Sequence, residues 1–228
     1  MTDYDRKPTY LIGVDLGQAN DYTALCVVEM HTKGDGHQAE RSYQVRHLDR
    51  LPLGTPYPEQ VEAVSRVVEL VKQQQRAQAS PWPSDQAKVR PPRLVVDQTG
   101  VGRPVVDMLR KAGHRGLMAV SIHGGDTSSR EGSDYRVPKR ELVAVTQVLL
   151  QTNRLGVAAS LPHAQTLTRE MLAFKVSFSK TGHDSYGNDW RENDHDDLVL
   201  AVALAVWAGE SIRYVSERAN RALAAWGV

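Results

Sequence analysis

Three apolar segments, far apart in the sequence, each carry aspartate at one end. The first is residues 10–17 (YLIGVDLG), a strand-like run closed by an acid and a glycine, and the second is residues 94–97 (LVVD). The third is the apolar run 198–208, which directly follows an Asp-Asp pair. Residues of the first two types suit buried strands, and sites in α/β sheets lie beyond strand ends. We therefore expect one fold to bring the three acidic ends together.

The apolar pattern along the chain predicts an α/β domain. Period-two or continuous apolar runs predict strands at 10–15, 23–30, 41–48, 93–97 and 117–122, the first three as an antiparallel meander. Helical spacing predicts helices after Pro56, from Pro104 to Gly113, at 139–152, at 161–173, and from a cap at Asn193 or Asp194. This order predicts a mixed β-sheet flanked by helices. We also expect a mobile loop at 124–136 and a hairpin formed by strands at 174–178 and 186–190.

The length of 228 residues suits one domain, with a core at about 10–208 and a polar C-terminal tail at 209–228. Charges nearly cancel, with 28 Lys and Arg against 27 Asp and Glu, so net charge gives no argument for nucleic acid. Residues 102–140 carry eight Lys and Arg against four Asp and Glu, which allows a local basic face.

The sequence also excludes several classes of protein. A single cysteine rules out a disulfide framework and a Cys-based zinc site. The N-terminal residues carry no apolar signal core, and the longest apolar run, 198–208, is too short to span a bilayer. We therefore expect a soluble, intracellular protein.

The aspartates suggest a metal site. If the strands ending at Asp15 and Asp97 are parallel neighbours, their carboxylates lie side by side, and such acids repel unless a cation neutralises them. Carboxylate oxygens suit Mg²⁺ or Mn²⁺, and Asp196 and Asp197 at a helix N-terminus would complete the cluster. Two cations about 4 Å apart can activate water and stabilise the leaving oxygen in phosphoryl transfer. The alternatives are a turn residue for Asp15 and a helix cap for Asp196.

Four segments together resemble a known family. GVDLGQANDYTALCVVE, VVDQTGVGRPVVDML, VPKRELV and HDDLVLAVALAVW are similar to the nuclease domain of tailed-bacteriophage terminase large subunits, and the resemblance covers about residues 10–207. It implies the RNase H-like fold, which Holliday-junction resolvases share. It implies cutting of double-stranded DNA in phage genome packaging, dependent on two Mg²⁺ or Mn²⁺ ions. Catalytic and metal-binding acids would then be Asp15, Asp97 and the pair Asp196 and Asp197, of which we favour Asp197 as the direct ligand.

Several cations are candidates for contacts with DNA phosphates. The resemblance suggests that Lys139 lies near the acids and contacts phosphate; the alternative is an exposed cation at a helix start. Arg140 lies beside it, and Arg103 lies at a Gly-rich helix start that could face phosphate. Lys175 and Lys180 would lie on the expected hairpin. Such contacts would be independent of DNA sequence and sensitive to salt.

The sequence departs from the family in one respect. It has no G-x-x-x-x-G-K-[ST] loop, so the chain by itself cannot be the translocating motor. We expect a separate terminase ATPase, a small terminase subunit or a portal protein as partners, no membrane partner, and the host cytoplasm as location if the chain is phage-encoded. The alternatives are a Holliday-junction resolvase, an actin-like ATPase fragment, and a non-catalytic DNA-binding protein.

Overall fold

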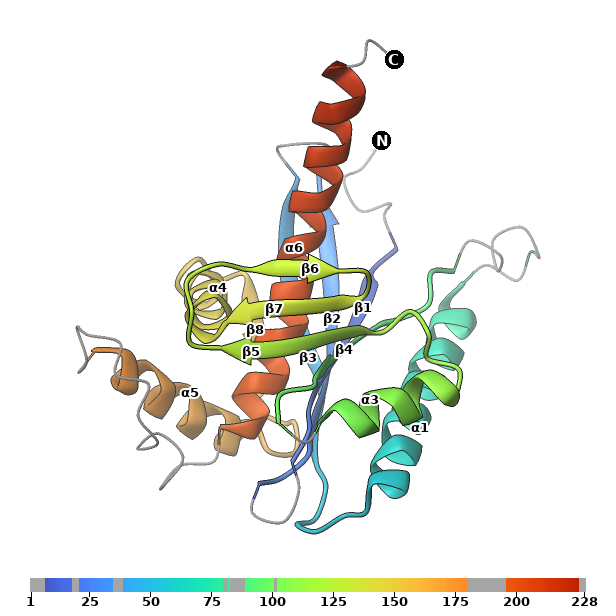
Figure 1. Cartoon of the computed structure of the whole chain (residues 1–228), viewed down its shortest axis with the longest axis vertical. Helices are drawn as coiled ribbons and strands as arrows, with labels where there is room; N and C mark the ends of the chain where they lie inside the picture. The colour runs from blue at the N-terminus through green and yellow to red at the C-terminus, as the bar shows by residue number, and fades with distance from the viewer. Residues whose placement is uncertain are drawn as a thin grey trace.

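An eight-stranded mixed sheet forms the centre of the computed structural model, with helices on both faces (Figure 1). The structure describes residues 7–17, 21–34, 39–79, 82, 89–100, 102–179 and 196–225, without the side chains of 174–179 and 212–225. The strands are β1 (Thr9–Asp15), β2 (Ala24–Lys33), β3 (Glu40–Arg50), β4 (Arg93–Asp97), β5 (Met118–His123), β6 (Ser129–Glu131), β7 (Asp134–Pro138) and β8 (Leu155–Val157). The helices are α1 (Tyr57–Gln78), α3 (Gly102–Lys111), α4 (Lys139–Gln151), α5 (Ala164–Ser179) and α6 (Asp197–Ala225).

The strand order is β6-β7-β5-β4-β1-β2-β3-β8. The first three strands form the predicted antiparallel meander, and β4, β5 and β7 extend it in parallel from β1. The carboxyl ends of these parallel strands therefore lie at one edge of the sheet. The predicted α/β class, a mixed sheet flanked by helices, is confirmed by this topology.

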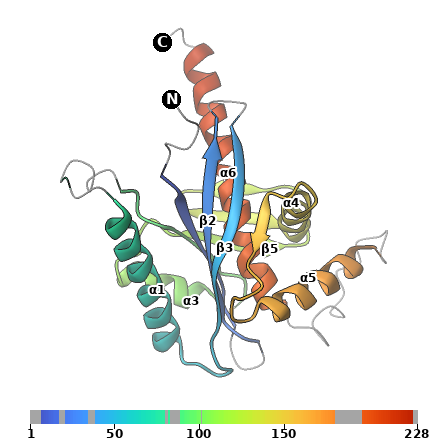
Figure 2. The same ribbon diagram turned by 180° about the vertical axis from the view of Figure 1, so that it is seen from behind.

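Alternation along β1 separates the two faces of the sheet. Tyr10, Ile12 and Val14 pack in the cluster formed with α1 and α3, whereas Leu11 packs in the cluster formed with α4, α5 and α6. Figures 1 and 2 show these two groups of helices on opposite sides of the sheet. The chain is thus three layers deep, and the odd-numbered positions of β1 face α6.

Helix α6 is the central helix that the sequence predicted. All of its residues from 198 to 208 are buried, which explains why this run is apolar on every side. Gly13 on β1 allows the helix to come this close, because a Cβ atom there would lie 1.9 Å from the carbonyl oxygen of Ala201. No helix in the described part of the chain is both long and apolar enough to cross a membrane.

Some local predictions were wrong. The expected loop at 124–136 contains the hairpin β6–β7, which turns at Gly132 (φ 60°) and pairs with β5, so a tertiary partner outweighs the loop-like composition. The expected strand at 174–178 is instead the last part of α5, because five alternating residues do not distinguish a strand from a helix. Strand β8 was missed, since three residues carry no period.

Two further predictions concern the C-terminal third. The expected caps Asn193 and Asp194 and the second hairpin strand at 186–190 lie outside the described residues, and α6 begins at Asp197. The polar tail expected at 209–228 continues α6 as helix to Ala225. Figure 1 shows this part of α6 running past the sheet.

Candidate active site

The first two acids lie side by side, as the sequence predicted. Strands β1 and β4 are parallel neighbours with Val14 opposite Val96, and Asp15 and Asp97 are the next residues of each strand. Strand alternation places both on the face of the sheet that α6 covers. Asp97 is 8% exposed. Burial raises the pKa of both carboxyl groups, and the charge of Asp97 raises that of Asp15 further.

The start of α6 brings the other two acids to the same place. Asp196 directly precedes the helix and Asp197 is its first residue. Burial holds the pKa of Asp15 well above its usual range, and the charges of Asp97, Asp196 and Asp197 raise it further. Four carboxyl groups from three separate elements thus act on one another across a single site.

Thr99 orients the carboxylate of Asp97. Its backbone N–H and its hydroxyl both donate to Asp97 Oδ1, at 2.7 Å and 2.5 Å. The same hydroxyl oxygen accepts from the backbone N–H of Ile122 on β5, at 2.7 Å. Burial raises the pKa of Asp97 while these two hydrogen bonds from Thr99 oppose the rise. Asp97 is therefore held in one orientation by its own loop and by the neighbouring strand.

Lys139 lies at the acid cluster, where the resemblance placed it. It is the first residue of α4, directly after β7, which ends at the same edge of the sheet as β1 and β4. Its Nζ is 2.8 Å from Asp196 Oδ2, and its side chain is 15% exposed. The charge of Lys139 lowers the pKa of both Asp15 and Asp97, against the effect of burial. It compensates part of the negative charge of the cluster.

Sequence reasoning missed two residues beside Asp197. Arg50 at the end of β3 places Nη2 at 3.2 Å from Asp197 Oδ2 and also donates to Glu170 Oε1. Glu170 was detectable, because it follows Leu167 by three residues on the buried face of a predicted helix, where an acid needs a partner. Arg50 gave no signal, since it ends a strand with weak alternation.

The other predicted DNA contacts are not gathered at the acids in the same way. Arg140 pairs with Asp126, Nη1 to Oδ1 at 2.5 Å, and so fastens the segment before β6 to α4. Arg103 is exposed in the first turn of α3. Lys175 falls within α5 rather than on a hairpin, with its side chain outside the described part, and Lys180 lies outside the described residues altogether.

The chemistry of these donors fits a divalent cation. Carboxylate oxygens are the ligands that Mg²⁺ and Mn²⁺ prefer, and burial, followed by the charges of the neighbouring acids, raises the pKa of Asp15. Among the described residues, no three His, Cys, Asp or Glu side chains are already arranged around a common position for an ion. Thr99, Lys139 and Arg50 contact the carboxylates instead. Cation binding would require some of these carboxylates to change partners.

The fold and the site together define an α/β domain, built on a mixed sheet, with a carboxylate cluster at the edge where its parallel strands end. No family model matches the chain, and no curated protein matches it. Among solved structures, the chain is similar to the large terminase nuclease from thermophilic phage G20c, with 19% identity, 89% of this chain and 83% of that chain covered, and a TM-score of 0.49. The same nuclease with bound magnesium gives 19% identity, 90% and 83% coverage, and a TM-score of 0.48.

The chain is also similar to RuvC from Thermus thermophilus, with 14% identity, 90% of this chain and 96% of that chain covered, and a TM-score of 0.40. At such identities these similarities are of fold alone. The function proposed below is therefore argued from the geometry of this chain.

Proposed function

We propose that the chain is a metal-dependent endonuclease that hydrolyses phosphodiester bonds of double-stranded DNA. The observation that carries the proposal is the convergence of Asp15, Asp97, Asp196 and Asp197 from β1, β4 and the start of α6. A buried group of like charges is costly to keep unless it serves to bind cations. Two Mg²⁺ or Mn²⁺ ions, when bound, would supply activation of water and stabilisation of the leaving oxygen.

The residues of the chain take distinct roles in this proposal. Asp15 and Asp97 would hold the cations together with Asp197, which we favour over Asp196 as the direct ligand. Ligating carboxylates are commonly oriented by polar contacts with other side chains, and the ion pair of Asp197 with Arg50 would serve this purpose. Asp196 holds Lys139 beside the cluster, where the ammonium group would orient a DNA phosphate.

Double-stranded DNA is the substrate that the motif resemblance favours. Arg103, Arg140, Lys175 and Lys180 are proposed as further contacts with the backbone, independent of base sequence. Binding would weaken steeply with salt. In phage genome packaging the partners would be a separate terminase ATPase, a small terminase subunit or a portal protein, with no membrane partner.

Plasmid cleavage tests the proposal. We expect the wild-type chain to nick and linearise supercoiled DNA with Mn²⁺ or Mg²⁺ and not with EDTA. Loss of a side chain that orients a metal ligand typically lowers activity about 10–100-fold. Asp15→Asn and Asp97→Asn remove proposed ligands themselves, so their cleavage activity should fall by more than this, while circular dichroism shows the fold retained. Asp126→Asn, which changes an acid 70% exposed in its side chain and paired with Arg140, is the matched control and should cleave normally.

Two results would contradict the proposal. One is metal-dependent cutting retained by Asp15→Asn, and the other is a wild-type chain that cuts no DNA with either metal. A linear duplex and a four-way junction are compared in the same assay. Strong preference for the junction would replace the packaging role with that of a junction resolvase.

A further inference from the structure

Arg50 joins four separate parts of the chain beside the acid cluster. Its guanidinium group lies 4.6 Å from the centre of the Tyr22 ring, in a cation–π contact. The same group contacts Asp197 Oδ2 at 3.2 Å and donates to Glu170 Oε1. Only 13% of the Arg50 side chain is exposed, so its planar fork is fixed between an aromatic ring and two carboxylates.

Glu170 fixes the start of α6 at the same time. It is 6% exposed, and its second oxygen, Oε2, accepts a hydrogen bond from the backbone N–H of Val199 at 3.0 Å. The first N–H groups of a helix have no partner within the helix, so Glu170 on α5 caps α6 from outside. A buried carboxylate at this end also suits the helix dipole. One acid therefore determines both where Arg50 lies and where the first turn of α6 lies.

Asp197 depends on both contacts. It is the first residue of α6, so the cap from Glu170 sets its backbone, and the contact with Arg50 sets its carboxylate. We propose that Arg50 and Glu170 are positioning residues, which hold the Asp197 carboxylate toward Asp15 and Asp97 for binding of a divalent cation. This inference rests on the proposed function.

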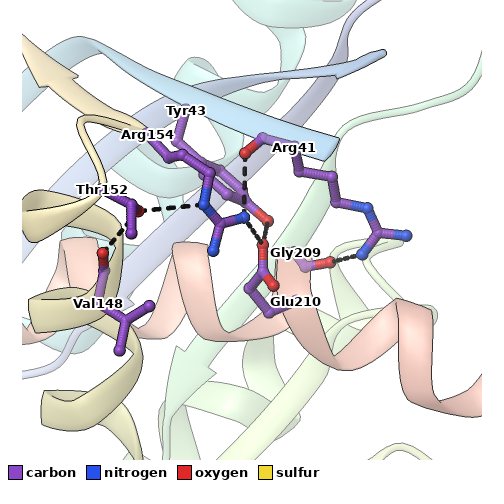
Figure 3. Close-up of polar contacts among 7 residues, drawn as sticks. All are labelled: Arg41, Tyr43, Val148, Thr152, Arg154, Gly209 and Glu210. Atoms are coloured by element: carbon purple, nitrogen blue, oxygen red, sulfur yellow. Dashed lines mark hydrogen bonds and ion pairs between the residues drawn. The ribbon is translucent and has the colours of Figure 1, made fainter. Parts of the chain in front are cut away.

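A second network on α6 provides a matched control (Figure 3). Glu210 accepts from the Tyr43 hydroxyl at 2.8 Å and pairs with Arg154 at 3.2 Å, so this network also ties α6 to β3. The side chains of Arg154 and Glu210 are 19% and 23% exposed, which is similarly sheltered. A change at Glu210 should therefore affect stability without affecting cation binding.

The test measures Mn²⁺ affinity of the DNA-free protein by titration calorimetry, together with plasmid cleavage and thermal unfolding. Arg50→Met keeps the apolar part of the side chain and removes the charge. Loss of a positive charge near the site would by itself tighten cation binding, so weaker binding identifies positioning. We expect Arg50→Met and Glu170→Gln to weaken Mn²⁺ binding about 10–100-fold, with cleavage restored at higher Mn²⁺. Arg50→Lys should be intermediate, since it keeps the charge without the fork.

Glu210→Gln should lower the unfolding temperature and leave Mn²⁺ affinity unchanged. The positioning role is overturned if Arg50→Met binds Mn²⁺ as tightly as wild type and cleaves at the wild-type rate. Should Arg50→Met fail to fold, the same result with Glu170→Gln overturns it. That result leaves the proposed function intact as long as Asp15→Asn is inactive. A wild-type chain that neither binds Mn²⁺ nor cleaves overturns both.

Discussion

Helix α6 is attached to β3 at two places that use the same chemistry for different ends. At its start, Arg50 bridges Asp197 and Glu170. Further along, Arg154 pairs with Glu210. Both are arginine–carboxylate contacts on sheltered side chains. Arg50 belongs to β3 itself, whereas Arg154 lies just before β8, and in the second place it is the Tyr43 hydroxyl that connects β3 to Glu210. What differs is the charge that surrounds them.

The second region has no excess of acid, since the carboxylate of Glu210 lies with two arginines, Arg41 and Arg154. Arg41 donates to the carbonyl oxygen of Gly209, and Arg154 and the Tyr43 hydroxyl share the carboxylate of Glu210 (Figure 3). Burial raises the pKa of Tyr43, so its hydroxyl stays protonated and donates. These contacts link β3 and the segment before β8 to α6, and the network serves to hold the helix in place.

The first region is not balanced. Four aspartates and Glu170 face the two cations Arg50 and Lys139 among the described residues. Burial raises the pKa of Glu170 to about 7, with the charge of Asp197 adding to the rise, even though Arg50 opposes it. Two similar ion pairs can therefore differ in setting: the pair without surrounding acid holds the helix in place, and the pair at the start of α6 lies within an excess of negative charge.

The largest loss of stability is expected from Gly13→Ala, which would disturb α6 between the two regions. The new Cβ would lie 1.9 Å from a backbone oxygen of Ala201, so the helix must move. Overpacking typically costs about 1–3 kcal/mol, and a backbone clash puts this change at the upper end. Urea unfolding measures the cost. Gly116→Ala, where a Cβ meets nothing within 4 Å, is the control, and equal effects of the two variants would contradict the prediction.

Glu210→Ala should separate the two regions. It leaves the Tyr43 hydroxyl and Arg154 without their shared acceptor, and an unsatisfied buried group costs about 1–3 kcal/mol. Cleavage per folded molecule should stay at the wild-type rate, measured in the plasmid assay below the unfolding temperature. A loss of cleavage without a loss of stability would show that this region also serves the site.

Asp15→Asn should stabilise the metal-free protein. Burial and Asp97 raise the pKa of Asp15, so the folded protein binds a proton more tightly than the unfolded chain does. The resulting stabilisation is present at low pH and is lost as pH rises from the usual value of 3.8 through the raised pKa. Asparagine does not ionise, so the variant does not lose this stabilisation as pH rises. Its free energy of unfolding should exceed that of wild type by roughly 0.5–2 kcal/mol at pH 7 and by little at pH 4.

Urea unfolding at several pH values, with EDTA present, measures this difference. Addition of Mn²⁺ should stabilise the wild type more than the variant, which reverses the order at pH 7. A variant that is less stable than wild type at pH 7 without metal would contradict the charge imbalance of the first region.

The smallest effect is expected at an exposed pair on the same strand. Arg46 on β3 contacts Glu29 with a side chain that is 54% exposed. Surface pairs contribute about 0–1 kcal/mol, so Arg46→Met should change stability within that range and leave cleavage and Mn²⁺ affinity unaltered. If Arg46→Met changed Mn²⁺ affinity more than Arg50→Met does, the prediction that only the buried arginine of β3 serves the site would be contradicted.

The motif acids were predictable because each marks the end of an element with a strong pattern. The strands that end at Asp15 and Asp97 are apolar and short, and parallel pairing of such strands places their ends together. The apolar run of α6 identified a central helix whose start carries the acid pair. Lys139 was found through motif resemblance rather than through period or spacing.

The partners of those acids were not predictable. Arg50 reaches Asp197 across 147 residues of sequence, and nothing local to either residue encodes the contact. The hairpin β6–β7 was not predicted for the same reason, because its pairing with β5 outweighs a loop-like composition. Glu170 lies between these cases, since its place on a buried helix face was visible but its partners were not.

The sequence by itself determined the order and type of the main elements and the ends at which acids lie, because hydrophobic period and strand-end residues are local properties of the chain. Only the tertiary structure decided which cations offset which acids, that α6 is capped by α5, and that the start of α6 lies in an excess of acid while its middle, at Glu210, does not. Those outcomes depend on distances between elements far apart in the chain, and charge interactions follow distance and burial rather than sequence order.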